Sequence, residues 1–208
     1  MTHRHCAQSP PHAARSWRYR SGGVHLDLGV DPDIVVYAKA MSNGYPIAAI
    51  IGTDTVMEAA QDCFVSSTYW TEALGPVAAL ATIAEYERVR PWSHFKQAGA
   101  RVVAVWKEAG RRHELPISLR STGPLSSFSF QGGEANVAKT LFTQCMLERG
   151  FLASTAFYAS LAHTDEGIDS YAHACDEVFG VIKAASVSGS LHAALRGPEA
   201  HTGFTRLN

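Results

Sequence analysis

The chain has 208 residues and a formal net charge of −1, from eighteen basic and nineteen acidic residues. Apolar residues make up 46% of the chain and charged residues 18%, which predicts a folded chain and excludes disorder as its main state. The near-zero charge gives no support for electrostatic binding of nucleic acid or an anionic membrane. The sequence has neither an apolar run long enough to span a membrane nor a secretory signal, so we expect a cytoplasmic protein.

The first half of the chain shows turn signals between short apolar runs. Residues 1–17 mix histidine, proline and arginine without any periodicity and predict a loose tail. The β-branched runs 34–38 and 47–52 predict two buried strands. Thr55, with a glutamate three residues on, predicts the capped start of a short helix that ends near Asp62.

A polar loop at 66–71 then precedes an alanine-rich helix predicted over 72–90, which Pro91 ends. One stripe of this helix is apolar and suits either a packed subunit interface or a helix buried within one chain. The stripe consists of Leu74, Val77, Ala78, Ala81 and Tyr86.

Beyond Pro91 the patterns change to those of a small sheet with covering helices. The predicted elements are a helix capped by Ser93 and ending at Arg112, antiparallel strands at 117–119 and 125–130, a helix over 134–149 ended by Gly150, a strand at 151–153, and a long helix capped by Thr164. The sequence thus divides into an α/β region at 18–92 and an α+β region at 93–187, with a C-terminal extension at 188–208.

Lys39 is the residue that most directly suggests chemistry. It directly follows the apolar run 34–38 and precedes the tight turn at Ser42, Asn43 and Gly44. A lysine at the mouth of a buried strand loses hydration, which makes its amine a usable nucleophile. A strand-end lysine that extends into solvent is the alternative, and the residue alone does not distinguish the two.

The motifs around Lys39 recur in a fixed order along the chain. They are Trp17-Arg18-Tyr19-Arg20, Gly22-Gly23, Gly29-Val30-Asp31-Pro32-Asp33, Ala38-Lys39-Ala40-Met41-Ser42-Asn43-Gly44-Tyr45-Pro46, Ser67-Thr68-Tyr69-Trp70-Thr71, Met146-Leu147-Glu148-Arg149-Gly150 and Ser160-Leu161-Ala162-His163-Thr164-Asp165-Glu166. With these motifs, residues 17–187 resemble the class III, fold-type I pyridoxal-phosphate aminotransferases. Glutamate-1-semialdehyde 2,1-aminomutase and its relatives are the members that the sequence resembles most.

The resemblance implies an α/β fold: the C-terminal part of a fold-type I large domain at 18–92, then a small α+β C-terminal domain at 93–187. It implies pyridoxal 5'-phosphate as cofactor, with Lys39 as both its Schiff-base residue and a proton shuttle. Thr68 matches a threonine that reaches across a homodimer to the cofactor phosphate of the neighbouring subunit, with Thr71 as the alternative. The substrates implied are a small-molecule amino donor and a carbonyl acceptor.

The residues around Thr68 agree with this role, because a hydroxyl in a loop before a helix start can favour an anion together with backbone N–H groups and the helix dipole. An ordinary helix-capping region is the alternative. His163 directly precedes the predicted cap Thr164, so we interpret it as structural. Arg111, Arg112 and His113 end a helix, where positive charge complements the dipole, and we prefer that reading to a substrate carboxylate site.

The resemblance fades before Trp17. A full family member is much longer, and its N-terminal half supplies the phosphate-binding turn and the aspartate that protonates the cofactor's ring nitrogen. By spacing, that aspartate would fall at Pro11, and residues 10–15 contain no acid. A truncated gene product and a natural half-length protein both remain open.

Three functions follow. The leading one is a truncated class III aminotransferase that transfers an amino group through the Lys39 Schiff base. The first alternative is a glutamate-1-semialdehyde 2,1-aminomutase. The second is a non-catalytic remnant without the N-terminal cofactor-binding half. The ten histidines and the cysteines Cys6, Cys63, Cys145 and Cys175 lack zinc-site spacing, so a metal- or DNA-binding module is not favoured.

Overall fold

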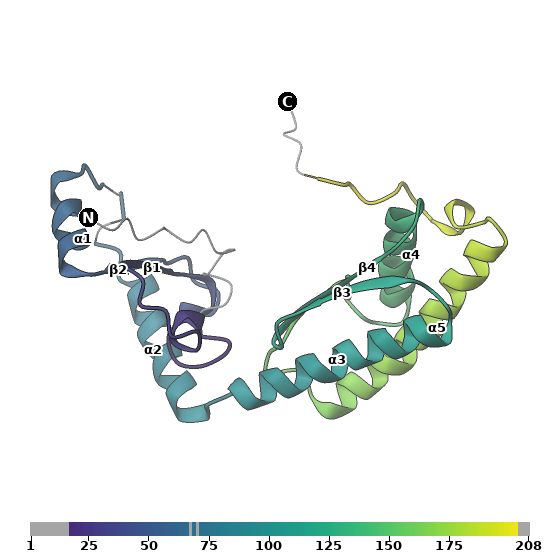
Figure 1. The fold of residues 1–208 in the computed structure, drawn as a ribbon, viewed down its shortest axis with the longest axis horizontal. Coiled ribbons are helices and arrows are strands. Elements are labelled where there is room, and N and C mark those ends of the chain that lie inside the picture. Colours follow the sequence, from purple (N-terminus) through teal and green to yellow (C-terminus); the bar gives the residue numbers. More distant parts are fainter. Residues whose placement is uncertain (1–16, 67, 70, 204–208) are drawn as a thin grey trace. The chain divides into compact units, whose positions relative to one another are not determined.

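The computed structural model describes residues 17–66, 68, 69 and 71–203, which Figure 1 shows as a ribbon. The chain divides into two compact units, Met1–Trp92 and Ser93–Asn208. We call them the N-terminal unit and the C-terminal unit and describe each by itself. The predicted loose tail lies outside the described residues except for Trp17, which is buried rather than loose. Among the described helices, none is long and apolar enough to cross a membrane.

The N-terminal unit contains two short strands and a long helix. Its elements are the 3-10 helix η2 (Val24–Leu26), β1 (Ile34–Tyr37), the 3-10 helix η3 (Lys39–Met41), β2 (Ala49–Gly52), α1 (Asp54–Ala59), the 3-10 helix η4 (Ala60–Asp62) and α2 (Leu74–Val89). β1 and β2 form an antiparallel pair in which Ile34 lies opposite Gly52 and Tyr37 opposite Ala49. Both predicted strands are therefore confirmed, each in shortened form.

The expectation that these strands are buried is wrong for this chain. Ile34 and Val36 of β1 keep 50% and 44% of their surface exposed, and Ile50 of β2 keeps 58%. The pair covers only a small core made of Trp17, Met41 and Ala79, which Tyr37 and Ala49 join from the sheet. The physical reason is that the described residues supply a layer to one face of the pair and leave most of the other face uncovered.

The helix ends of this unit depart from the predicted capping. The N-cap of α1 is Thr53 rather than Thr55, and no side-chain hydrogen bond caps this helix. α2 ends at Arg90, whose backbone is left-handed (φ 50°, ψ 57°), and Pro91 follows. The buried residues of α2 are Gly75 and Ala79, and the predicted apolar stripe faces the core only in part: Tyr86 packs against it, whereas Leu74 and Val77 are 57% and 60% exposed.

The C-terminal unit is a three-stranded antiparallel sheet with helices against it, as the sequence predicted (Figure 1). Its elements are α3 (Trp92–Arg112), β3 (Ile117–Ser121), β4 (Leu125–Phe130), α4 (Ala135–Glu148), β5 (Ala156–Tyr158), α5 (Asp165–Val187) and the 3-10 helix η5 (His192–Ala194). Strand order is β3-β4-β5.

Phe128 of β4 lies at the centre of this core. Its ring packs against Trp106 of α3, Phe142 of α4 and Phe179 of α5, at centroid distances of 4.9, 5.3 and 5.7 Å. Phe142 and Phe179 are fully buried. The sheet and three helices therefore meet in one aromatic cluster, in which the side chains of all four elements exclude water.

Three local predictions can be compared in this unit. Thr164 caps α5, and its hydroxyl accepts a hydrogen bond from the Gly167 N–H at 3.1 Å, as expected. Gly150 (φ 84°) ends α4 in a left-handed conformation that glycine adopts without a Cβ clash. The strand predicted at 151–153 is wrong, because Phe151 closes this helix end through its N–H to the Met146 carbonyl and β5 begins only at Ala156.

Candidate active site

Lys39 occupies a strained backbone position directly after β1. Ala38 is extended (φ −159°), and Lys39 then opens η3 with a positive φ of 56°. Of the five lysines in the chain, Lys39 alone has a positive φ. A non-glycine residue pays about 1–3 kcal/mol for this conformation, and such residues cluster at functional sites, where the surrounding structure enforces them.

Two buried residues, Met41 and Ser42, hold the turn that follows Lys39. Met41 is 6% exposed and packs into the core with Trp17 and Ala79. Ser42 is 1% exposed, and its hydroxyl donates a hydrogen bond to the Tyr45 carbonyl across the turn. These two contacts fix the backbone on the C-terminal side of Lys39. A serine before Asn-Gly favours a side-chain-stabilised turn, but the burial of Ser42 was not predicted.

The side chain of Lys39 itself is exposed, and in the described part of the chain no carboxylate forms an ion pair with it. The dehydrated surroundings expected for a lysine at a buried strand are therefore not present within the described residues of one copy. The cause is the exposure of β1, which leaves the strand end open to solvent. Any dry pocket around the Lys39 amine requires groups beyond those described.

Thr68 lies in an exposed turn before α2, with its neighbours Ser67 and Trp70 outside the described residues. No hydrogen bond joins Thr68 to Lys39 within the described part of the chain. Thr71, the alternative candidate, is also exposed. Thr68 is therefore accessible to solvent in this unit.

The start of α2 does not supply the anion site that the sequence suggested. The Glu72 carboxylate accepts hydrogen bonds from the Leu74 N–H at 2.6 Å and the Gly75 N–H at 3.2 Å. Pro76 follows and has no N–H to offer. The first-turn donors of α2 are therefore occupied by a protein carboxylate, a cap the sequence analysis missed although a glutamate at a helix start is a known signal for it.

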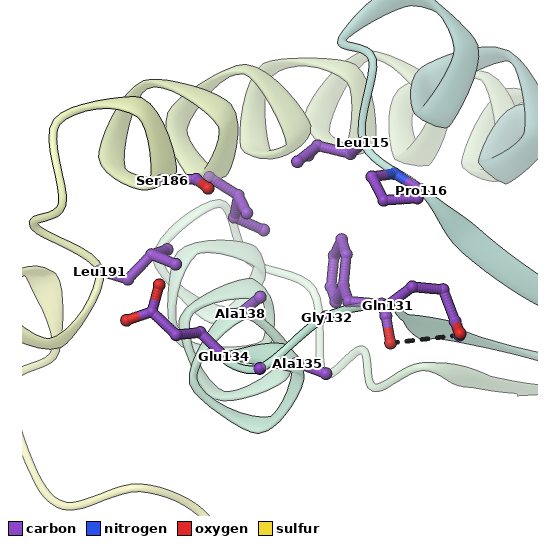
Figure 2. Close-up of a pocket in the computed structure, with 12 residues that line it drawn as sticks. Leu115, Pro116, Gln131, Gly132, Glu134, Ala135, Ala138, Ser186 and Leu191 are labelled. Carbon is purple, nitrogen blue, oxygen red and sulfur yellow. Dashed lines mark hydrogen bonds between the residues drawn. The ribbon is translucent and has the colours of Figure 1, made fainter.

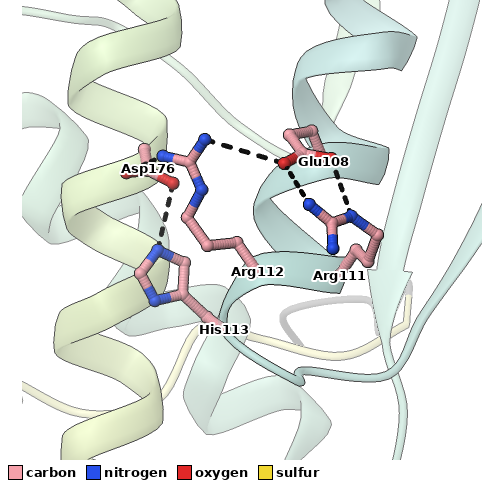
Figure 3. Close-up of polar contacts among 5 residues, drawn as sticks. All are labelled: Glu108, Arg111, Arg112, His113 and Asp176. Atoms are coloured by element: carbon pink, nitrogen blue, oxygen red, sulfur yellow. Dashed lines mark hydrogen bonds and ion pairs between the residues drawn. The ribbon is translucent and has the colours of Figure 1, made fainter.

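The basic residues at the end of α3 are neutralised by the protein's own acids (Figure 3). Arg111 donates to both carboxylate oxygens of Glu108, at 2.9 and 2.6 Å. Arg112 lies 2.9 Å and His113 3.1 Å from different oxygens of Asp176 on α5. The hydrogen bond from Arg111 also holds the pKa of Glu108 below its ordinary value. This cluster ties α3 to α5, which favours the structural interpretation over a substrate carboxylate site.

A hollow of about 150 Å³ lies in the C-terminal unit beside the start of α4 (Figure 2). Its walls combine apolar side chains, among them Leu115, Phe130 and Ile182, with polar groups, and Glu134 stands at its edge. The lining contains no lysine and no nucleophilic cysteine. Covalent carbonyl chemistry of the kind expected at Lys39 therefore has no counterpart here.

His163 and the buried cysteines have structural surroundings. The Nδ1 atom of His163 accepts from the backbone N–H of Ser160 at 3.1 Å and lies 3.0 Å from its hydroxyl, which orders the turn before α5. Cys145 and Cys175 are buried, and burial raises the pKa of the Cys175 thiol to about 12. A thiol that stays protonated at neutral pH is a poor nucleophile. The described residues also contain no cluster of acids, histidines and cysteines that could hold a metal ion.

Comparison with known protein families identifies the family of this chain. The profile described as "Aminotransferase class-III" matches residues 20–178 of the chain. This chain belongs to the class III aminotransferases. The match includes Lys39, Thr68 and most of both units, and it confirms the resemblance inferred from the motifs.

The relatives that this chain matches include aminotransferases named for different substrates and an aminomutase. The chain is 30% identical to the 3-aminobutyryl-CoA aminotransferase of Cloacimonas acidaminovorans over 86% of this chain and 45% of that protein. It is 27% identical to the 2'-deamino-2'-hydroxyneamine transaminase of Streptomyces kanamyceticus, over 78% of this chain and 42% of the relative. It is also 30% identical to a glutamate-1-semialdehyde 2,1-aminomutase of Lysinibacillus sphaericus, over 73% and 39%.

Solved class III structures have the same fold as the described part of this chain. The FumI protein of Sphingopyxis, solved in its pyridoxal-phosphate internal aldimine form, matches 83% of this chain with a TM-score of 0.74 and 24% identity. An S-selective transaminase from Arthrobacter matches 84% with a TM-score of 0.72. These neighbours confirm the predicted fold-type I class. The chain spans less than half the length of the relatives and structures it matches, 42% and 44% of the last two.

Class III aminotransferases use pyridoxal 5'-phosphate, and the donors present in this chain fit that group in kind. The unpaired amine of Lys39 is suited to an aldehyde carbon, and the exposed hydroxyl of Thr68 to a phosphate oxygen. By spacing, the family's acid for the ring nitrogen would fall at position 11. This chain has Pro11 there, which has no acidic group and lies outside the described residues.

Proposed function

We propose that this chain provides the lysine-bearing part of a pyridoxal-phosphate site and that the function of this site is class III amino-group transfer. The observation that carries the proposal is the position of Lys39. It lies within the matched family region, directly after a strand, and is the one lysine with a left-handed backbone. In this proposal residues 18–92 belong to the cofactor-binding large domain, 93–187 form the small domain and 188–208 extend it.

The residues divide the work as follows. Lys39 would hold the cofactor through its amine and would move a proton at the substrate α-carbon. When bound, the cofactor supplies an electron sink for the charge that develops at that carbon. Ser42 and Met41 hold the turn that aims Lys39, and Thr68 donates its hydroxyl to the phosphate of a second copy.

The exposure of Thr68 and the exposed apolar side chains of α2 support a homodimer. Leu74, Val77 and Leu80 are 57%, 60% and 70% exposed on this helix, next to the Thr68 turn. Exposed apolar side chains grouped on one helix favour an interface. We infer that two copies associate through α2 and thereby bring each Thr68 to the other copy's cofactor, in a cytoplasmic enzyme that takes a small amino donor and a carbonyl acceptor.

The exact reaction has two candidates. Aminotransferases with different substrates occur among the relatives, which supports the broader label. Aminomutase relatives such as the one from Lysinibacillus sphaericus support a 1,2-amino shift on glutamate 1-semialdehyde as the second candidate. A spectrum with each amine substrate in turn distinguishes them, since only a true substrate converts the bound cofactor to its amine form.

The first test is the visible absorption spectrum of the purified chain mixed with pyridoxal phosphate. We expect a new band that borohydride removes by fixing the cofactor onto Lys39, detected on the Lys39 peptide by mass spectrometry. Lys39→Ala should abolish the band, whereas Lys139→Ala, which removes another exposed lysine, should leave it. Equal labelling of all five lysines would show ordinary surface chemistry and contradict a built site.

A second test concerns Thr68. Thr68→Ala removes one hydroxyl donor to the phosphate, and a hydrogen bond to a charged group is worth about 1.5–3 kcal/mol. We therefore expect roughly ten-fold or greater weakening of cofactor affinity with the band position unchanged. Thr71→Ala serves as the matched control, and an effect at Thr71 with none at Thr68 would transfer the role to the alternative threonine.

A further inference from the structure

The segment after α5 runs back along α4, and we call residues 190–200 of this segment the strap. The strap lies beyond residue 178, where the match to the class III profile ends. The chain turns at Gly189 (φ 67°), and the contacts of the strap with α4 then move from Gln144 to Asn136, toward the start of the helix. The strap therefore runs antiparallel to α4.

A polar stripe of α4 holds the backbone of the strap. Its members are spaced four residues apart and so share one face of the helix: Asn136, Thr140, Gln144 and Glu148. The Gln144 amide donates to the Ala194 carbonyl at 3.1 Å, and its oxygen accepts from the Arg196 N–H at 2.9 Å. Asn136 donates to the Ala200 carbonyl at 2.8 Å, and Thr140 accepts from the Ala200 N–H at 3.0 Å. These side chains thus pair with backbone groups at both ends of the strap.

The strap buries little apolar surface. Leu191 is its one buried residue, at 3% exposure, and the others are half-buried or exposed. Arg196 forms an ion pair with Glu148 at 2.9 Å, but the Arg196 side chain is 76% exposed. Burial of apolar surface is the main stabilising contribution in a fold, whereas exposed hydrogen bonds and ion pairs contribute little. The strap should therefore open more easily than the helices it contacts.

The start of the strap lies at the hollow beside α4. Leu191 lines this hollow together with Phe130 and Ile182, and Glu134 lies at its edge (Figure 2). His192, the next residue of the strap, lies 3.8 Å from the Glu134 carboxylate. The strap thus supplies one wall of the hollow and also contacts its rim. A movement of the strap away from α4 would withdraw Leu191 and open the hollow to solvent.

We propose that the strap is a releasable lid: it leaves the α4 stripe as one unit, and its release uncovers the hollow. The strap has no helix or strand after η5, so its contacts with α4 hold it in place from residue 195 onward. Loss of the contacts at Gln144 should therefore loosen the contact at Thr140 as well. This inference is independent of cofactor binding at Lys39, so the two proposals can fail separately.

The first test is hydrogen–deuterium exchange of the full chain, followed for individual amides by NMR. The Arg196 and Ala200 amides donate to Gln144 and Thr140, so they report on two separate points of the strap. Both should exchange faster than the amide of Phe142, which lies in the core of the same unit, because a locally opened strap exposes them without unfolding the helices.

Three variants show whether the strap opens as one unit. Gln144→Leu removes both bonds made by this side chain and keeps its approximate size. Asn136→Ala is the reciprocal variant at the other end of the strap. Thr143→Val is the matched control, because the Thr143 hydroxyl donates to the Lys139 carbonyl of its own helix. Circular dichroism checks that each variant folds.

We expect Gln144→Leu to speed exchange at Ala200 by about tenfold, since it removes two hydrogen bonds of the strap, although the Thr140 partner of Ala200 is unchanged. Asn136→Ala should likewise speed exchange at Arg196, and Thr143→Val should change neither amide. Faster exchange only at the amide next to each substitution would show separate contacts and overturn the proposal. Strap amides that exchange as slowly as Phe142 would also overturn it, since the strap would then be a permanent part of the core.

The second test measures access to the hollow. Ala138 lines the hollow and is 6% exposed, so Ala138→Cys places a thiol there. Its labelling by iodoacetamide is followed by mass spectrometry, and Cys175, which is fully buried in α5, reports unfolding of the unit in the same sample. Combining Ala138→Cys with Gln144→Leu should speed labelling of the introduced thiol by the factor seen at the Ala200 amide, with Cys175 unchanged. Labelling that stays constant while the strap amides exchange faster would show that the strap does not cover the hollow, and would overturn its role as a lid.

Discussion

The two units of this chain use apolar residues in opposite ways. Of the twenty-five buried apolar residues in the described part of the chain, twenty-two lie in the C-terminal unit and three in the N-terminal unit. Of the twenty large apolar side chains that are exposed there, fourteen lie in the N-terminal unit and six in the C-terminal unit. The smaller core belongs to the unit that carries Lys39 and Thr68.

The two units therefore differ in what they need in order to be stable. The C-terminal unit closes its own core around Phe128, so its elements stabilise one another. The N-terminal unit presents apolar faces on its sheet and on α2, which is the pattern of a surface made for partners. A site built on that unit is therefore incomplete until those faces are covered, which explains why Lys39 is solvent-exposed within one copy.

The largest expected effect is the loss of a ring from the C-terminal core. Phe142 is fully buried against Phe128, Phe130 and Phe179. Phe142→Ala should lower the free energy of unfolding by about 3–5 kcal/mol, measured by urea titration with circular dichroism. Leu152→Ala, at a side chain 97% exposed, is the control and should have almost no effect. A small loss at Phe142 would mean that this core is not closed.

The second largest effect on stability is expected where helix α3 packs closely against the β3–β4 turn. A Cβ added at Gly99 would overlap the carbonyl oxygen of Gly123, a backbone atom that cannot move aside by rotating a bond. Gly99→Ala should therefore destabilise the chain by about 1–3 kcal/mol or more. Gly133→Ala is the matched control, because no atom lies within 4 Å of its added Cβ and its φ is not positive. Equal stability of the two variants would contradict this close packing.

The sequence predicted some local structure well, but two predicted caps are wrong: Thr53 rather than Thr55 is the N-cap of α1, and Ser93 lies inside α3. The Thr164 cap, the Gly150 helix end and the β3–β4 pair all depend on neighbours in the chain, and all three are confirmed. It failed where competing local groups determine the outcome. Phe151 was predicted to start a strand, but its N–H instead closes α4.

The candidate site was predictable only in its reactive residues. Lys39 and Thr68 were identified from the resemblance of their motifs to the family, and their roles stay predictions. Their surroundings were not predictable, because burial depends on which faces are covered. The expectation of a buried β1 required a second covering layer, and a continuous apolar run does not show whether that layer belongs to the same chain. Nor did the sequence analysis recognise that Glu72 takes the free N–H groups of α2.

Helix capping offers a smaller comparison between the units. The Thr164 hydroxyl accepts from the Gly167 N–H, whereas Thr53 makes no such bond at the start of α1. Thr164→Ala should cost about 1 kcal/mol of stability. The same change at Thr53 should cost clearly less, and the pair is compared by thermal unfolding under one set of conditions. A larger loss at Thr53 would show that α1 depends on its cap after all.

The smallest effect is expected at Leu80, which is 70% exposed on α2. At low protein concentration Leu80→Ala should change the free energy of unfolding by less than about 0.5 kcal/mol, because no core contact is lost. At high concentration the wild type should gain stability from association of two copies through α2, and the variant should gain less. Unfolding midpoints at two concentrations separated a hundredfold measure the difference. A loss above about 1 kcal/mol that is the same at both concentrations would place Leu80 in a core within one chain, and the contrast between the two units would then be smaller than their exposed surfaces indicate.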